Sequence, residues 1–142
     1  MTSYLGKLNT DYNFGMVKEG EMIGLLERLF GCPLKKTTRY VVFDYEGENI
    51  SIELKTRRNK ANKYPTTMIG MGKVNEGLKR IRNNPNHSIY FVFCFTDSIQ
   101  YFQLTEDNLD KCNIGLGGRN DRFNEEINEY LYIPIEELNI IN

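Results

Sequence analysis

Apolar residues near the start of the chain recur at the spacing of one helix face. Within residues 19–30 the apolar positions are Met22, Ile23, Leu25, Leu26, Leu29 and Phe30. Residues three and four positions apart lie on the same side of an α-helix, so this pattern predicts an amphipathic helix. Gly31 and Pro33 follow, and both residue types commonly end helices. We therefore predict a helix over residues 19–30.

Two segments rich in Val, Ile, Tyr and Phe follow, at residues 39–46 and 49–55. Their composition is typical of strands, and Gly47-Glu48 between them suits a two-residue type II′ hairpin turn. With Glu46 opposite Asn49, the apolar side chains of both strands fall on one face. The opposite face then carries the polar residues Asp44, Ser51, Glu53 and Lys55.

The central part of the chain predicts a basic loop and a second helix. Residues 56–65 are polar and basic, and Thr66 or Thr67 can cap a helix that runs to about Asn83. Its buried stripe would contain Ile69, Val74, Leu78 and Ile81. Gly70, Gly72 and Gly77 weaken this helix unless they mark a close approach of its backbone to a neighbour or a ligand.

The C-terminal half predicts strands and one loop. Residues 88–96 form a nearly continuous apolar run, as expected of a central strand that is covered on both faces. Residues 99–104 pair back on it across the Asp97-Ser98 turn. The glycine-rich residues 113–124 are interpreted as a mobile loop, and residues 130–135 as a last strand.

Length and composition favour one soluble domain that spans residues 1–142, with 40% hydrophobic and 26% charged residues. No apolar run is long enough for a membrane span, and the N-terminus lacks the layout of a signal peptide. We therefore expect an intracellular protein, cytoplasmic or associated with the nucleoid or nucleus. Three widely spaced cysteines and one histidine argue against a disulfide framework or a zinc site.

Positive charge is concentrated in one segment, although the net charge of the chain is only −1. Residues 55–82 contain nine basic residues and one acidic residue, a local charge of +8. Such a run is compatible with an ordinary solvated surface. It is also what a surface that binds a polyanion requires.

The polar face of the hairpin carries the candidate chemistry. If Asp44 lies opposite Ser51, Glu53 is its diagonal neighbour, about 7–8 Å away between Cα atoms. Two carboxylates at this distance can bind one hard cation such as Mg²⁺. Lys55 lies on the same face, where it can hold a water molecule and favour ionised carboxylates. The alternative is that these three residues are only the wet side of a half-exposed sheet.

Asp44 and the triplet Glu53-Leu54-Lys55 resemble the signature of the PD-(D/E)xK nucleases, the restriction-endonuclease-like superfamily. The resemblance covers residues 15–96 and implies an α/β fold, a mixed central sheet flanked by helices in the order αβββαβ. Members often carry an acidic residue on the first helix, and Gly20-Glu21 matches that feature. Phe43 stands where members often have proline, so Glu46 is kept as a weaker substitute for Asp44, on the wrong face.

The resemblance implies a DNA endonuclease that depends on Mg²⁺, with Mn²⁺ as a substitute. Asp44, Glu53 and the Leu54 carbonyl would hold the metal, Lys55 would orient the attacking water, and Glu21 would be a further catalytic acid. Cleavage of both strands would require a homodimer, because one small domain offers one active site. DNA contacts are expected from the basic segment and a neighbouring tyrosine: Arg57, Arg58, Lys60, Lys63, Tyr64 and Lys73. Arg119 and Arg122 are further candidates.

Two other functions stay open. One is a non-catalytic nucleic-acid-binding or interaction module on the same fold, although such a module has no need for three converging charges. The other is a metal-dependent hydrolase of a different phosphoester. Within the nuclease class, duplex, branched DNA and RNA all remain candidate substrates. The absence of a separate recognition domain favours structure-specific or weakly sequence-specific cutting.

Overall fold

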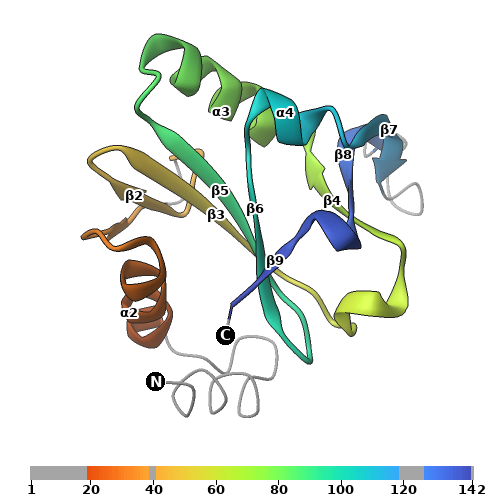
Figure 1. Cartoon of the computed structure of the whole chain (residues 1–142), viewed down its shortest axis with the longest axis horizontal. Helices are drawn as coiled ribbons and strands as arrows, with labels where there is room; N and C mark the ends of the chain where they lie inside the picture. Colours follow the sequence, from red (N-terminus) through yellow and green to blue (C-terminus); the bar gives the residue numbers. More distant parts are fainter. Residues whose placement is uncertain (1–18, 39–40, 119–126, 142) are drawn as a thin grey trace.

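The computed structural model describes residues 19–38, 41–118 and 127–141 (Figure 1). The helices are α2 (Glu19–Phe30), α3 (Met71–Asn83) and α4 (Glu106–Leu109), with 3₁₀ turns η1 (Ala61–Lys63) and η3 (Ile135–Glu137). The strands are β1 (Lys35–Lys36), β2 (Tyr45–Gly47), β3 (Ile50–Thr56), β4 (Thr66–Gly70), β5 (Ser88–Cys94), β6 (Ile99–Gln103), β7 (Asn113–Gly118), β8 (Ile127–Pro134) and β9 (Asn139–Ile140). None of the helices in the described ranges is long and apolar enough to cross a membrane.

A six-stranded mixed sheet in the order β1-β2-β3-β5-β6-β9 forms the centre of the molecule. Strands β3 and β5 are parallel, and the other neighbours are antiparallel. Helix α2, the meander β1-β2-β3, helix α3 and strand β5 follow one another in the chain, with β4 inserted before α3. The predicted αβββαβ core with a mixed sheet is therefore confirmed. The apolar run predicted as a central strand is β5, which has neighbours on both sides.

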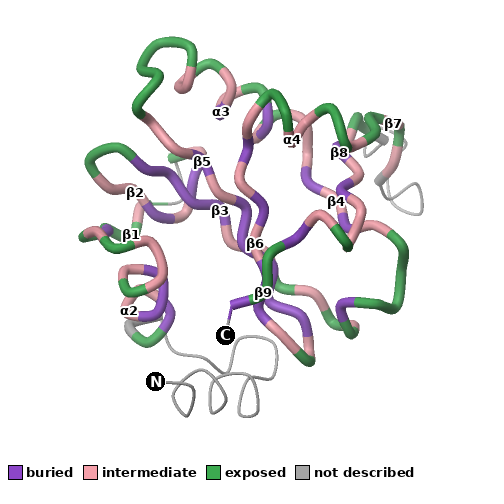
Figure 2. The backbone as a smooth tube through the Cα atoms, viewed as in Figure 1, coloured by how far each residue is buried: buried purple, intermediate pink, exposed green. Residues whose placement is uncertain are grey.

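Helix α2 covers one face of the main sheet, and it has the bounds that the sequence predicts. Met22, Leu25 and Leu26 are buried in a cluster that also contains Tyr45 and Ile52 from the sheet. Gly31 ends the helix with a φ of 71°, a left-handed conformation that glycine adopts without strain. Figure 2 shows the buried residues concentrated along the middle strands β3, β5 and β6.

The other face of the main sheet is covered by α3 and by a second sheet in the order β4-β8-β7. Leu131 and Ile133 of β8 are buried there with Phe91 and Phe102 of the main sheet. Gly77 lets α3 approach closely, because a Cβ at this position would lie 2.8 Å from a methyl carbon of Leu104. The expectation that a glycine of this segment marks close packing is confirmed at Gly77.

Two predictions of local structure are wrong, and in both cases β8 is the reason. Thr66–Gly70 is not the start of a helix but strand β4, which pairs antiparallel with β8. Helix α3 begins only at Met71. Asn113–Gly118 is not a loop but strand β7, which pairs with the other edge of β8. The remainder of the predicted loop, with Arg119 and Arg122, lies outside the described residues.

The predicted hairpin register is also wrong. Tyr45 lies opposite Ile52 and Gly47 opposite Ile50, so the turn is at Glu48-Asn49. The shift keeps every side chain on its predicted face, which is why the hydrophobic pattern could not detect it. Gly47 permits the observed register, because this register leaves no room for a side chain at position 47. A Cβ there would lie 2.7 Å from a methyl carbon of Ile50 and 2.9 Å from the Pro33 carbonyl oxygen. Residues 41–44, predicted as strand, form a bend before β2.

Candidate metal-binding and catalytic site

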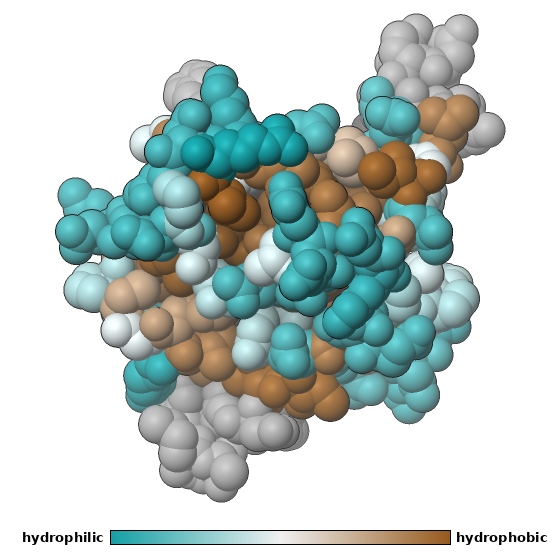
Figure 3. All heavy atoms as spheres, turned by 45° about the horizontal axis from the view of Figure 1, so that its top comes forward, coloured by the Kyte–Doolittle hydropathy of each residue, from teal (hydrophilic) through white to brown (hydrophobic). Residues whose placement is uncertain are grey.

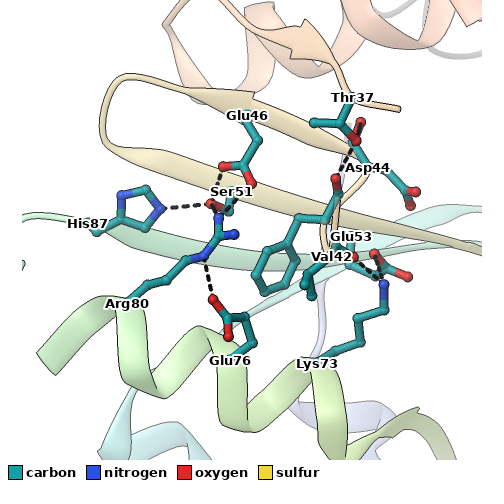
Figure 4. Close-up of polar contacts among 11 residues, drawn as sticks. Thr37, Val42, Asp44, Glu46, Ser51, Glu53, Lys73, Glu76, Arg80 and His87 are labelled. Atoms are coloured by element: carbon teal, nitrogen blue, oxygen red, sulfur yellow. Dashed lines mark hydrogen bonds and ion pairs between the residues drawn. The ribbon is translucent and has the colours of Figure 1, made fainter. Parts of the chain in front are cut away.

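Strand β3 carries Glu53 and Lys55 on the face of the sheet that α3 covers. The Glu53 side chain is only 4% exposed, and its Oε2 lies 3.2 Å from Lys55 Nζ. Lys73, in the first turn of α3, places its Nζ 3.3 Å from the other carboxylate oxygen, Oε1 (Figure 4). The structure thus brings together Glu53 and Lys55, which the sequence analysis assigned to the catalytic site, and Lys73, which it assigned to DNA contacts.

Asp44 approaches the same carboxylate from the bend before β2. Its Oδ2 accepts a hydrogen bond of 2.8 Å from the backbone N–H of Leu54. The shifted register explains this contact: one step beyond the pair Tyr45 and Ile52, Asp44 comes beside Glu53 itself. The predicted diagonal arrangement, with Asp44 opposite Ser51, is therefore wrong, because Ser51 pairs with Glu46.

The backbone carbonyl of Leu54 points to the side of strand β3 from which the carboxylates approach. Within a strand, the N–H and C=O of one residue point to the same neighbour. Since the Leu54 N–H points to Asp44, its carbonyl oxygen also points away from β5 and toward the bend. The predicted ligand set of two carboxylates and one carbonyl is therefore compatible with the backbone. In the described ranges no group of three or more His, Cys, Asp or Glu side chains could hold a metal. The acidic side chains that come together at this site are Asp44 and Glu53.

Burial raises the pKa of Glu53, and the nearby Asp44 charge raises it further, while Lys55 and Lys73 act in the opposite direction. Oε1 of Glu53 is buried and has no hydrogen-bond partner, since Lys73 lies within ion-pair distance but not in hydrogen-bond geometry. A buried carboxylate oxygen without a hydrogen bond is costly. A divalent cation would supply the missing interaction and offset the repulsion between the two acids. The site therefore fits a metal ion.

Lys73 also ties the helix to the bend that presents Asp44. Its Nζ donates a hydrogen bond to the backbone carbonyl of Val42, two residues before Asp44. On the other side of the bend, Thr37 Oγ1 donates to the carbonyl of Phe43 at 2.5 Å. The short irregular segment that carries Asp44 is thus held from two elements.

A second polar cluster lies along the same strands and was missed by the sequence analysis. We call it the Arg80 cluster; its members are Glu46, Ser51, Glu76, Arg80 and His87. The Arg80 guanidinium lies 2.5 Å from Glu46 and 3.1 Å from Glu76. It donates to Ser51 Oγ at 2.9 Å and stacks over the Phe43 ring at 4.9 Å. The sequence pattern gave no signal for it, because Ser51 is 29 residues from Arg80 and 36 from His87, and each residue is ordinary by itself.

One interpretation changes with this cluster. His87 closes the turn after α3, where its backbone N–H donates to the Asn84 carbonyl at 2.9 Å, and its Nε2 lies 2.7 Å from Ser51 Oγ. Glu46, predicted on the wrong face, shares the face of Asp44, since it accepts a hydrogen bond from Ser51, which lies two residues before Glu53 on the same side of β3. Its carboxylate is bound by Ser51 and Arg80, so it does not replace Asp44.

The structure places Glu21 away from this face. Its side chain is exposed on α2, and α2 packs on the opposite side of the sheet, against Tyr45 and Ile52. Its assignment as a catalytic acid stays a prediction.

The predicted DNA contacts are divided between an internal brace and an exposed loop. Arg57 donates to the carbonyl of Met68 at 2.7 Å and stacks over the Phe93 ring, so it joins β3 to β4. Burial lowers the pKa of Arg57. The other loop residues, Arg58, Lys60, Lys63 and Tyr64, are exposed. They follow directly on the end of β3 that carries Lys55.

Comparison with known protein families shows what the chain is similar to. The family described as "Phage putative PDDEXK endonuclease" matches residues 16–141, nearly the whole chain. The chain belongs to this family. The match includes β7 and β8 of the second sheet, which lie beyond the residues on which the sequence resemblance rests. No curated protein matches the chain.

Membership in the PDDEXK family supports a nuclease that acts on nucleic acid. Nucleases of this class generally use divalent metal ions. The signature of the class, an acidic residue followed by an acidic residue and a lysine two positions later, is carried here by Asp44, Glu53 and Lys55. These are the residues that the fold brings together.

Proposed function

We propose that the protein is a DNA endonuclease dependent on a divalent metal ion, with Asp44, Glu53 and Lys55 at its active site. The observation that carries the proposal is the Glu53 carboxylate, which is almost fully buried and leaves Oε1 without a hydrogen bond. The fold thus maintains a costly charged group between an aspartate and two lysines. Such a group has a physical reason to exist if it binds a cation.

Asp44, Glu53 and the Leu54 carbonyl are the groups that would hold the metal, and their all-oxygen chemistry suits Mg²⁺ or Mn²⁺. When bound, the metal supplies Lewis acidity toward the phosphate and lowers the pKa of water. The backbone N–H of Leu54 fixes the Asp44 carboxylate by its 2.8 Å hydrogen bond. Asp44 is therefore oriented before any metal or substrate binds.

Lys55 is placed to act on water and phosphate. Its side chain is 36% exposed, and among the described residues its Nζ forms one ion pair, at 3.2 Å to Glu53 Oε2. An ammonium group has three donors, so two remain for a water molecule or a phosphate oxygen. Lys55 would orient the attacking water and offset the negative charge that develops at the phosphate during in-line attack.

The exposed basic loop after β3 supports DNA as the polyanion. Lys60 and Lys63 extend the positive surface from Lys55, and Tyr64 is 53% exposed beside them. Contacts of this kind position a phosphate backbone without reading its sequence. Because such binding releases counterions, affinity should fall steeply with salt, and Lys60→Ala with Lys63→Ala should reduce that slope. A salt-independent affinity would contradict this footprint.

Cleavage assays with the full chain test the function. Wild type, Lys55→Ala and the control Lys79→Ala, an exposed lysine of α3, are compared on supercoiled plasmid, linear duplex, single strands, a four-way junction and RNA. Each reaction contains Mg²⁺, Mn²⁺ or EDTA. We expect metal-dependent cutting by wild type and Lys79→Ala, and a loss of about 10²–10³-fold in Lys55→Ala.

Two results would contradict the proposal. If Lys55→Ala cuts as fast as wild type, the activity comes from a contaminant or from another site. If wild type binds DNA in a salt-dependent way but cuts no substrate with any metal, the non-catalytic binding module becomes the better interpretation. The expected homodimer is tested by light scattering, which gives the mass of the protein, and by the products of plasmid cleavage. A monomer should nick one strand at a time.

A further inference from the structure

A groove of about 960 Å³ opens next to the candidate active site. One wall is the bend at Val41 and Val42, and the second is the junction between β4 and α3 from Gly70 to Lys73. The third wall is formed by β7 and β8, through Leu116 and residues 128–130. The volume lies at the upper end of the range of about 300–1,000 Å³ that is typical of ligand sites.

Lys73 belongs both to this groove and to the active site. It lines the groove, and its Nζ lies 3.3 Å from Glu53 Oε1. The same Nζ donates to the Val42 carbonyl, and Val42 also lines the groove. The groove therefore begins at the residue that contacts Glu53, within reach of a nucleotide that flanks a phosphate bound there.

The walls of the groove do not suit a phosphate backbone. Among the described lining residues Lys73 is the one cation, and Glu129 adds a carboxylate to the lining. Two large apolar side chains are exposed there instead, Val41 at 41% and Leu116 at 73%. Figure 3 shows brown, apolar atoms in the open at the outer end of the β7–β8 hairpin. Because both side chains line one groove, they can contact an apolar part of a ligand there.

The same walls suit the flat face and the polar edge of a nucleobase. Leu116 and Val41 provide apolar contacts for the face of a base. Glu129 pairs with Leu116 across β7 and β8 and therefore lies on the same face, where its carboxylate can accept hydrogen bonds from the amino and imino groups of a base. Gly70 and Gly72 keep the wall at the junction of β4 and α3 low, because neither has a side chain. A Cβ at either position would project into open space.

We propose that this groove, here named the base groove, holds an unstacked nucleobase next to the scissile phosphate. The preferred substrate is then a nucleic acid with an unpaired nucleotide at the cleavage position, such as a flap, bulge or junction, rather than a continuous duplex. This inference rests on the proposed nuclease function and specifies its substrate class. Base stacking on protein side chains gives an expected preference of about 10-fold over a fully paired substrate.

Cleavage of matched substrates provides the first test. The rates on a duplex and on the same duplex with one unpaired nucleotide are compared for wild type, Leu116→Ser and Ile114→Ser. Ile114 is the matched control, because it is an apolar residue of β7 that is 54% exposed but does not line the groove. Wild type and Ile114→Ser should prefer the unpaired substrate by about 10-fold, and Leu116→Ser should lose the preference.

A binding measurement provides a second readout that requires no cleavage. The fluorescent base 2-aminopurine is placed at the unpaired position, and the DNA is titrated with Glu53→Gln protein in EDTA. Quenching by stacking is expected, and it should disappear when Leu116→Ser is added to Glu53→Gln but persist with Ile114→Ser. Circular dichroism confirms that each variant is folded.

The outcomes separate this proposal from the nuclease function. Equal cutting of paired and unpaired substrates by wild type and Leu116→Ser, without quenching, overturns the base groove and leaves the nuclease intact. Absence of any cleavage overturns the nuclease, while the quenching result still decides whether the groove takes a base. A change of molecular mass by Leu116→Ser in light scattering, without loss of quenching, would assign the groove to contact between two copies of the chain.

Discussion

The Arg80 cluster and the group around Glu53 lie along the same two strands, β2 and β3, and face the same helix (Figure 4). Both contain carboxylates and cations, and both are shielded by α3. In the Arg80 cluster the central group is Ser51, which is fully buried. In the other group it is Glu53, which is 3% exposed as a whole residue. The two clusters therefore have similar burial but different hydrogen bonding.

A serine hydroxyl has one donor and two acceptor positions, and in Ser51 all three are used. It donates to Glu46, accepts from Arg80, and accepts from His87 when the imidazole carries its proton on Nε2. Glu53 Oε1, by contrast, has no hydrogen-bond partner. The difference shows that a polar cluster can be buried for two reasons. A saturated cluster fixes the fold, whereas an unsaturated carboxylate leaves a position for a ligand.

The largest expected difference between the clusters is in activity. Glu53→Gln should lose more than the roughly 10–100-fold that supporting contacts of a metal site contribute. Glu46→Gln, the same chemical change seven residues earlier, should lose activity only in proportion to the protein that remains folded. Initial cleavage rates, corrected for the folded fraction by circular dichroism, make the comparison. Equal loss in both variants would show that the two carboxylates do not have separate roles.

Stability, in contrast to activity, should depend on the Arg80 cluster. Arg80→Met removes the partner of two carboxylates and of Ser51, and we expect a loss of about 1–3 kcal/mol in the free energy of unfolding. Arg82→Met is the control, because Arg82 is an exposed residue on the same helix. Urea unfolding measures both. If Arg80→Met is no less stable than Arg82→Met, the cluster does not hold the hairpin as its contacts suggest.

Glu53→Gln should stabilise the metal-free protein at neutral pH. The raised pKa of Glu53 means that the folded state disfavours its charged form. Wild type should therefore lose stability relative to Glu53→Gln as the pH rises above the usual value of 4.5 and through the folded pKa. Added Mg²⁺ or Mn²⁺ should raise the Tm of wild type but not of Glu53→Gln. Thermal unfolding with and without metal measures both Tm values. Equal shifts of Tm in the two proteins would contradict the prediction.

His87 should contribute a smaller pH effect of opposite sign. Burial lowers the pKa of His87 below 6.5, so the unfolded chain takes up the proton first as the pH falls. Stability should decline from about pH 6.5 downward until the folded imidazole is protonated. His87→Gln keeps a donor toward Ser51 and should lack this decline. Urea midpoints between pH 5 and 7 test it, and parallel curves for the two proteins would exclude the histidine as the cause.

Prediction from the sequence succeeded where the relevant interactions are local. The bounds of α2 and the strand β5 follow from apolar spacing within a dozen residues. The common face of Glu53 and Lys55 follows from the two-residue period of a strand, whatever the register. The family signature uses the same local spacing. The family was therefore recognised from Asp44 and Glu53-Leu54-Lys55 although the hairpin register and the strands β4 and β7 were predicted wrongly.

Prediction failed where distant segments compete for one stretch of chain. Thr66–Gly70 contains β-branched residues and glycine, and only the presence of β8 decides that it forms a strand before α3. Asn113–Gly118 is glycine-rich, yet the opposite edge of β8 makes it a strand. The base groove could not be predicted either, because its walls come from three segments that are far apart in the sequence.

The sequence by itself determined the family, the order of the main helices and strands, and the face that carries Asp44, Glu53 and Lys55, because each depends on short periodic patterns. Only the tertiary structure decided that Asp44 binds the Leu54 backbone and that Lys73 reaches Glu53. It also decided that Arg80 saturates Ser51 while Glu53 Oε1 stays without a hydrogen bond. The reason is that burial and hydrogen-bond partners depend on which distant segments pack together, and residue spacing carries no record of that.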